Sequence, residues 1–343
     1  SSGKNLTGKI AGNDATGQYK DWNAVGIVGW TEGISPEGLV DAWFGMLADA
    51  SVARVNGEIP LDPNGNPISK VYLTEQGHDL GQLIQKFLLG AVAFSQGADD
   101  YLDDDTDGKG LMADNTADVE GKSYTALEHN WDEGFGYFGA AADYMHYTDD
   151  EIAGKGGRDD WQKYHDTNGD GAIDVKSEYN FGHSINAAKR DRGASTDLTT
   201  EAFEAFHAGR TLISAAGGAL SDEQMDELKG YRDQAVMAWE KSIAATAIHY
   251  VNDVLKDMDA EEYNFNDHAK HWSELKGFAL SLQFNRNSPV TAENFARLHQ
   301  VIGTAPALPG AENFDAYRGS LNEARAILQQ AYGFDDNDVT EVW

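Results

Sequence analysis

The longest feature of the sequence is a helical pattern that runs from Ser221 to about Lys256. Ser221 is a typical N-cap, and acidic residues follow it. Long alternating runs of β-branched residues, which would indicate strands, are missing from the chain. The pattern therefore predicts a mostly helical protein. The apolar positions of this stretch recur at steps of three and four residues: Val236, Trp239, Ile243, Ala247, Tyr250 and Val254.

Several shorter stretches carry the same spacing. Ser35, Pro36 and Glu37 form a helix start, with Ser as N-cap, Pro at the first helical position and Glu near the positive end of the helix dipole. A second stretch carries apolar residues from Leu80 to Ala91, and a third spans about 123–147. Further helices are predicted at about 199–216, 265–285, 291–303 and 313–331.

These helices predict an all-α fold of two side-by-side helical bundles, with a calcium-type loop inserted between them. A stretch rich in Gly, Asp and Lys near 149–180 separates the two helical blocks. The predicted organisation is an N-terminal tail or linker (1–34), a first bundle (35–150), a loop-rich connector (151–198) and a second bundle (199–343).

The charge balance restricts the partners of this chain. It has 57 Asp and Glu residues against 26 Lys and Arg, a formal net charge of −31. Nucleic acids and anionic membranes need a basic surface, so cations are the expected partners. The chain has no Cys, which excludes disulfides, thiolate metal sites and a cysteine nucleophile. Its longest apolar run is far shorter than the roughly 20 residues of a transmembrane helix.

The connector contains the sharpest local signal, a run that matches the first part of a calcium-binding loop. Its oxygen ligands would be the side chains of Asp166, Asn168, Asp170 and Asp174 and the backbone carbonyl of Ala172. Position 12 of such a loop usually holds Glu but here holds Ser177, and Glu178 comes one residue late. Glu178 reaches the ion through a bulged loop, or the last ligand comes from elsewhere. The alternative is an acidic surface turn that binds no ion.

A second acidic run offers Asp103, Asp105 and Asp107 at the same alternate spacing. Carboxylates at every second position of a loop can surround a calcium ion. The match covers fewer ligand positions than the first run does. This run is therefore either a calcium site or a solvated acidic loop that binds no ion.

Two helical segments combine His with acidic residues. His129 has Asp132 and Glu133 at three and four residues further on, and His271 has Glu274 at three. Such spacing places imidazole and carboxylate on one helix face, where they can bind a transition metal. The alternative is that these His residues only pair with carboxylates and orient helices. Neither segment is a His-Glu-x-x-His zinc protease motif.

Four segments together resemble a bacterial imelysin-like lipoprotein group that is catalogued as a domain of unknown function, the DUF4856 family. The resemblance covers roughly 35–331 and implies two helical bundles on an exported lipoprotein, anchored through a Cys upstream of Ser1. It also implies a role in acquiring iron or another metal, with His129, Asp132, Glu133, His271 and Glu274 at the matching motif positions. The four segments are Gly81–Ala91, Glu128–Gly139, Trp239–Tyr250 and His271–Leu280.

Three functional hypotheses follow. The preferred one is a non-enzymatic periplasmic or cell-surface protein of an iron-type uptake system, stabilised by Ca²⁺, that binds a metal ion or metal complex and meets an outer-membrane receptor or another surface protein. The second is a calcium-dependent scaffold or adhesion protein with structural His residues. The third is a zinc metallopeptidase with Glu133 or Glu274 as general base. Iron or zinc is the expected transition metal, and no catalytic residue is assigned under the preferred hypothesis.

Overall fold

The computed structural model describes residues 5–13 and 18–343, and within these ranges every regular element is a helix. The predicted all-α class is therefore confirmed. Parts of the predicted tail, residues 1–4 and 14–17, lie outside the described residues. The α-helices are α1 (Trp22–Val25), α2 (Pro36–Val55), α3 (Leu80–Leu88), α4 (Ala126–Phe138), α5 (Asp149–Ala153), α6 (His183–Asp191), α7 (Leu198–Ala216), α8 (Asp222–Asp259), α9 (Phe265–Ser281), α10 (Ala292–Ile302) and α11 (Phe314–Tyr332).

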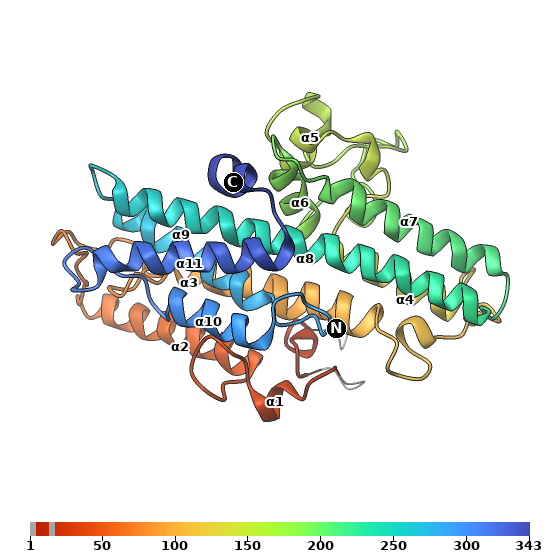
Figure 1. The fold of residues 1–343 in the computed structure, drawn as a ribbon, viewed down its shortest axis with the longest axis horizontal. Coiled ribbons are helices and arrows are strands. Elements are labelled where there is room, and N and C mark those ends of the chain that lie inside the picture. The colour runs from red at the N-terminus through yellow and green to blue at the C-terminus, as the bar shows by residue number, and fades with distance from the viewer. Residues whose placement is uncertain (1–4, 14–17) are drawn as a thin grey trace.

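Helix α8 organises the molecule. Its 38 residues extend over about 57 Å, and Figure 1 shows it running along most of the long axis. The predicted N-cap is confirmed, because the Ser221 hydroxyl accepts a hydrogen bond from the backbone N–H of Gln224. The side-chain oxygen of Gln224 in turn accepts a hydrogen bond from the backbone N–H of Ser221. Helices α7, α9, α11 and α6 all pack against α8.

The centre of the core lies around Trp239 of α8, which is completely buried. Its ring lies 5.2 Å from that of Phe94 and 5.5 Å from that of Phe138. Phe94 belongs to a π-helical continuation of α3 (Leu89–Phe94), and Phe138 ends α4. Both predicted blocks thus contribute to one hydrophobic core. The boundaries predicted at 35, 151 and 199 stay predictions.

Part of the predicted tail is packed into this core. Trp22 of α1 is 1% exposed, and its ring lies 5.0 Å from that of Phe284. The Tyr19 hydroxyl donates a hydrogen bond of 2.6 Å to the carbonyl oxygen of Gln283. Residues 18–34 therefore form part of the folded unit.

The predicted helix at 123–147 is wrong in its second half. Helix α4 ends at Phe138, because Gly139 adopts a left-handed conformation (φ 91°) and turns the chain. The segment after it runs beside the connector: the Phe181 N–H donates to Gly139 O (2.9 Å) and the Ala142 N–H to Ser177 O (2.8 Å). A Cβ at residue 139 would lie 2.3 Å from Phe181 O, so this contact requires glycine.

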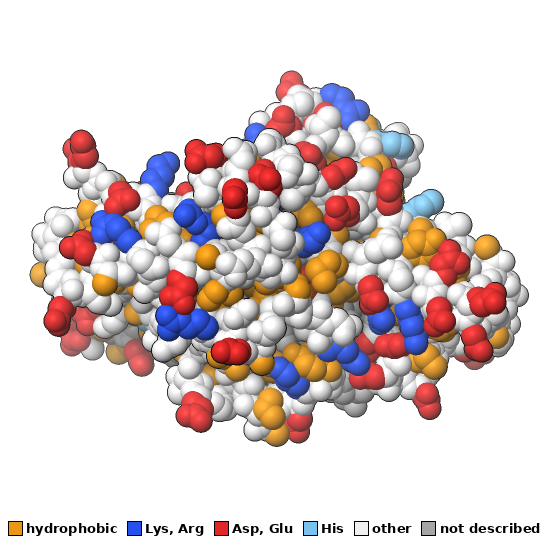
Figure 2. Space-filling model, in the orientation of Figure 1, with side chains coloured by type: hydrophobic (Ala, Val, Ile, Leu, Met, Phe, Trp, Pro, Cys, Tyr) orange, Lys and Arg blue, Asp and Glu red, His pale blue; other side chains and the backbone are white. Residues whose placement is uncertain are grey.

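None of the helices that the structure describes is long and apolar enough to cross a membrane. Figure 2 shows Asp and Glu side chains spread over the visible face, with Lys and Arg between them. Helices α5 and α6 form a raised region beside α8, together with the connector loops (Figure 1). This raised region contains the predicted calcium loop at 166–178, and α4 carries the predicted metal ligands His129, Asp132 and Glu133.

Candidate functional site

Helix α4 presents its predicted acidic face to solvent. Its opposite face is fixed by Leu127 and Trp131, both 1% exposed, and the Trp131 indole donates a 2.8 Å hydrogen bond to Phe206 O of α7. Thr125 and Glu128 form a capping box at the start of the helix. These contacts hold the outer face of α4, with its His129, at the surface.

On that outer face, His129 and its predicted acidic partners are only loosely joined. His129 Nε2 lies 3.8 Å from Glu133 Oε1, and both side chains are more than a third exposed. Asp132 Oδ1 instead accepts a 2.8 Å hydrogen bond from Arg210 of α7. The His129 ring stacks on Tyr124 at 5.2 Å. His129 therefore has one carboxylate neighbour, and Asp132 is engaged by a cation.

The second predicted pair is separated in the structure. His271 Nδ1 lies 2.7 Å from Asp257 Oδ2 of α8. Glu274 is 4% exposed and accepts a 2.9 Å hydrogen bond from the Tyr250 hydroxyl, with Lys86 Nζ 3.4 Å away. Burial acts to lower the pKa of His271, but the hydrogen bond that its ring donates to the Asp257 carboxylate raises this pKa above its ordinary value. His271 thus takes a different carboxylate from the predicted one.

A further His–Asp pair was not predicted from the sequence. His249 Nε2 lies 3.3 Å from Asp253 Oδ2, four residues further along α8. Burial lowers the pKa of His249 to about 3, helped by the charges of Arg190 and His271. The sequence feature that could have predicted this pair is the His-x-x-x-Asp spacing at 249–253, which places both side chains on one helix face.

The second acidic run lies around an arginine. The Arg286 Nη2 atom lies 3.1 Å from Asp99, 3.2 Å from Asp103 and 2.7 Å from Asp105. Burial raises the pKa of Asp99 to about 7 and, together with Asp105, that of Asp103 to about 8. Asp107 is exposed and lies outside this group. The guanidinium supplies the positive charge that calcium would supply.

The connector loop is closed by two carboxylates, those of Asp166 and Glu178. Asp166 accepts backbone N–H groups from residues 169, 170 and 171, at 2.8, 3.1 and 2.8 Å. Glu178 is 4% exposed and accepts the N–H groups of residues 167, 168 and 174, at 3.0, 3.2 and 2.9 Å. Glu178 therefore reaches into the loop although it comes one residue late.

The remaining predicted ligands of this loop form tight local turns. Asn168 Oδ1 accepts the N–H of Asp170, Asp170 Oδ1 accepts that of Ala172, and Asp174 Oδ1 accepts that of Lys176, all at 2.9 to 3.0 Å. Among residues 5–13 and 18–343, no group of three or more His, Asp or Glu side chains is arranged to hold a metal ion. Calcium, iron and zinc binding stay predictions.

A cleft of about 610 Å³ is lined by residues of α4 and of the connector loop. We call it the α4 cleft. One wall is α4, with His129, Asp132 and Glu133, and the other comes from the connector loop and the segment after it, with Val175, Lys176 and Phe181. Val175 is 65% exposed and Phe181 is 45% exposed. The cleft thus combines apolar walls with a rim of carboxylates and an imidazole, and the remaining lining residues are Ala93, Phe135, Gly136, Tyr137 and Ala140.

A model of a domain of unknown function (DUF4856) matches residues 48–334. The chain belongs to the DUF4856 family. The matched range covers α3 to α11 and the last part of α2, and it contains both walls of the α4 cleft. Among curated proteins no relative matches the chain, and no solved structure matches it either.

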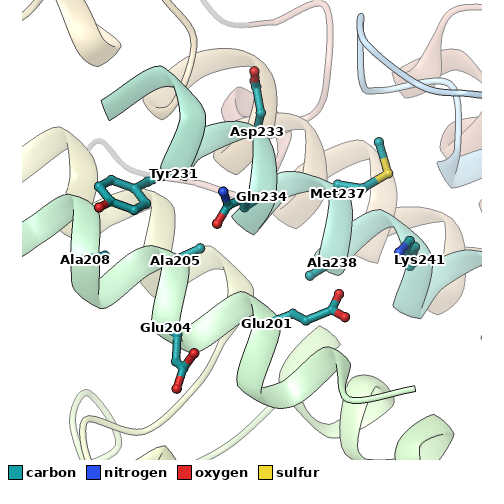
Figure 3. A pocket seen from close by; sticks show the side chains of 10 residues that line it. All are labelled: Glu201, Glu204, Ala205, Ala208, Tyr231, Asp233, Gln234, Met237, Ala238 and Lys241. Carbon is teal, nitrogen blue, oxygen red and sulfur yellow. The ribbon is translucent and has the colours of Figure 1, made fainter. Parts of the chain in front are cut away.

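Another hollow of this DUF4856 protein lies between α7 and α8 and has a volume of about 740 Å³. Figure 3 shows Ala205 and Ala238 facing each other across it, with Glu201 directed along the same gap. Glu204, Asp233 and Lys241 also line it. This groove contains none of the predicted metal ligands, so the α4 cleft is the stronger candidate site.

Proposed function

We propose that this DUF4856 protein is a non-enzymatic, calcium-stabilised binding protein whose ligand occupies the α4 cleft. One observation carries the proposal: the predicted calcium loop and the His129 cluster line the same cleft. A cleft of 300–1,000 Å³ with apolar walls and a few polar groups is typical of small-molecule sites.

The chemistry of the lining favours a positively charged ligand with an apolar body. Phe135, Tyr137 and Phe181 supply aromatic surface, and the carboxylate of Glu133 supplies negative charge at the rim. Aromatic faces and carboxylates both attract cations. A metal complex belongs to this class of ligand, and the half-exposed His129 imidazole is the group that would bind its metal.

Calcium would act through the shape of the connector wall. Val175 and Lys176 lie between Asp174 and Glu178, so the carboxylates that close the loop also place these two lining residues. An ion held by Asp166 and Glu178 would fix this wall. Ligand affinity is therefore expected to rise when calcium is present.

Calcium binding is tested by calorimetric titration and by thermal unfolding with calcium, magnesium or chelator. A ligand that binds only the folded state at 100 times its Kd stabilises it by about 2.7 kcal/mol. We expect calcium to raise the Tm, and Asp166→Asn to remove this effect. A Tm that does not respond to calcium in the unaltered protein would refute the calcium part of the proposal.

The cleft is tested by filling it. A Cβ at Gly136 meets no atom within 4 Å, and the same holds for Gly230 of α8, which is a matched control outside the cleft. A panel of organic cations and of iron(III) and zinc(II) chelates is screened by thermal shift. We expect Gly136→Leu to abolish the response to any compound that binds, while Gly230→Leu keeps it. Equal responses in both variants would place the ligand elsewhere.

The wider biological setting is a proposal that rests on the sequence resemblance. We infer that the protein is imelysin-like, exported, lipid-anchored upstream of Ser1, and part of an iron-type uptake system with an outer-membrane receptor or another surface protein as partner. Elemental analysis after loading with iron and zinc tests the metal part. Fractionation of cells that express the full-length gene product tests export and anchoring.

A further inference from the structure

A group of cations lies without ion pairs in a chain that has a large excess of acid. Lys155, Lys163, Lys189 and Arg190 form no salt bridge with any carboxylate among the described residues. The neighbouring acids are engaged elsewhere: Glu151 pairs with Arg158 at 2.7 Å and Asp150 with Arg192 at 2.5 Å. With 57 acidic against 26 basic residues, unpaired cations gathered in one place need a physical explanation.

Arg190 is the strongest member of this group, which we call the α6 basic cluster. It lies near the end of α6, which packs against α5 and α8, and it is 7% exposed. Its Nε and Nη1 atoms are buried and have no hydrogen-bond partner. Burial lowers its pKa to about 10, so it is still charged at neutral pH. A buried guanidinium with unused donors is costly unless an anion meets it.

Lys163 has a backbone conformation that a lysine rarely adopts. Its φ is 73°, and it is the only non-glycine residue with positive φ in the described part of the chain. The Lys163 N–H donates to Glu151 O at 2.9 Å, and its carbonyl oxygen accepts the Asn180 N–H at 2.8 Å. A Cβ at Gly154 would lie 2.6 Å from Lys163 Cε, so this side chain lies against Gly154, next to Lys155. Strain of this kind persists where the surrounding structure enforces it, often at binding sites.

Lys189 connects these residues electrostatically. Burial lowers its pKa, and the nearby charges of Arg190, Lys163, Lys86 and Lys155 lower it further. Of these, Lys86 already has Glu274 at 3.4 Å. The carboxylates of Asp253 and Asp191 and the Tyr250 side chain also act on Arg190, but none of them forms a hydrogen bond or an ion pair with its guanidinium among the described residues. The α6 basic cluster therefore combines several cations that have no direct carboxylate partner.

We propose that the α6 basic cluster binds a compact, multiply charged oxyanion, namely phosphate or a phosphoryl group. The unused Nε and Nη1 atoms of the Arg190 guanidinium leave a positive charge and hydrogen-bond donors for an oxygen of such an anion, and the flexible lysines add charge around it. An extended polyanion is disfavoured, because the net charge of −31 repels it beyond the immediate surroundings of the cluster. None of the four residues of the cluster lines the α4 cleft, and the proposal does not depend on the function of that cleft.

Thermal unfolding and calorimetric titration with inorganic phosphate, at constant ionic strength set by sodium chloride, test the proposal. We expect phosphate to raise the Tm by several degrees, and sulfate to do so less. Lys189→Gln and Lys163→Gln should each weaken phosphate binding about tenfold. Lys241→Gln, which removes another lysine without an ion pair at a site on α8, should leave phosphate binding unchanged.

Arg190→Met gives the sharpest result, because it removes a buried cation from the empty protein. We expect this variant to unfold at a higher temperature than the unaltered protein without phosphate, and to show no shift with phosphate. A purely structural Arg190 would instead make the variant less stable under both conditions. An absent phosphate response in the unaltered protein, or an equal response in Arg190→Met and Lys189→Gln, would overturn the proposal.

Discussion

The two acidic runs of this protein share one spacing but differ in what their carboxylates contact. In the run at 103–107, Asp103 and Asp105 are bound by the guanidinium of Arg286, which lies more than 180 residues away in the sequence. In the loop at 166–178, Asp166 and Glu178 accept only N–H groups of their own loop. Alternate acids thus create an electronegative loop, but the neighbours in space decide which cation compensates it.

The largest expected effect comes from removing the cation of the first run. Arg286→Leu removes the guanidinium that contacts Asp99 and Asp103, so at pH 9, where both carboxyl groups are ionised, we expect a loss of about 4 kcal/mol in unfolding free energy. Urea denaturation measures it. Arg297→Leu, which breaks an exposed pair with Glu323, is the control and should cost below about 1 kcal/mol.

The effect of calcium on the stability of Arg286→Leu shows how far the two acidic runs differ. If the first run can hold a divalent cation once Arg286 is gone, added calcium should recover part of the lost stability in Arg286→Leu. A variant that keeps Arg286 but carries Asp166→Asn should not become more stable when calcium is added. A calcium response at 103–107 with Arg286 in place would mean that the two runs are equivalent after all.

The second prediction uses pH. Burial and the neighbouring Asp105 raise the folded-state pKa of Asp103 to about 8, so the folded protein keeps a proton that the unfolded chain releases near pH 4. This stabilisation is complete below pH 4 and is lost as the pH rises towards 8. Asp103→Asn should reduce the loss between pH 4 and 8 by on the order of 3 kcal/mol. Unfolding free energies at pH 5, 6, 7 and 8 measure it.

The third prediction concerns the carboxylate that closes the second loop. Glu178→Gln replaces one acceptor oxygen with an amide NH₂, which faces a backbone N–H and leaves it unsatisfied. We expect a loss of about 2 kcal/mol in the absence of calcium, together with a weaker calcium response. Glu204→Gln, at an exposed position on α7, is the matched control. A calcium response that persists unchanged would show that Glu178 only closes the loop.

The smallest effect is expected at Asp107, the exposed end of the first run. Asp107→Asn should change the unfolding free energy by within about 0.5 kcal/mol, because the side chain is exposed and no ion pair involves it among the described residues. Calorimetry with calcium is the second readout. A loss of calcium affinity in this variant would identify Asp107 as a ligand and would make the two runs more alike.

Helices with strong local signals could be predicted closely from the sequence. Ser35 caps α2 and Ser221 caps α8, as their capping patterns predicted. The helix at 123–147 could not be predicted to its end, because Ala142 and Met145 continue the helical spacing by coincidence. Gly139 ends α4 there, and what requires the turn is the close approach of Phe181.

The candidate sites were predicted less completely than the helices. The His129 face of α4 follows from periodicity, since Leu127 and Trp131 must face the core. The partner of His271 could not be predicted, because Asp257 comes from another helix and spacing reports only neighbours on the same helix. The pair of His249 and Asp253 could have been predicted, because these two residues are four apart on the same helix. The α6 basic cluster has a local signal only at residues 189–190.

The sequence by itself determined the helical class, most helix starts and the two electronegative loops, because these depend on interactions between residues close together in the chain. Only the tertiary structure decided that Arg286 compensates one loop, that the other shares a cleft with His129, and that Arg190 is buried without a partner. Charges and cavities depend on which distant segments meet in space, and no local pattern encodes that meeting.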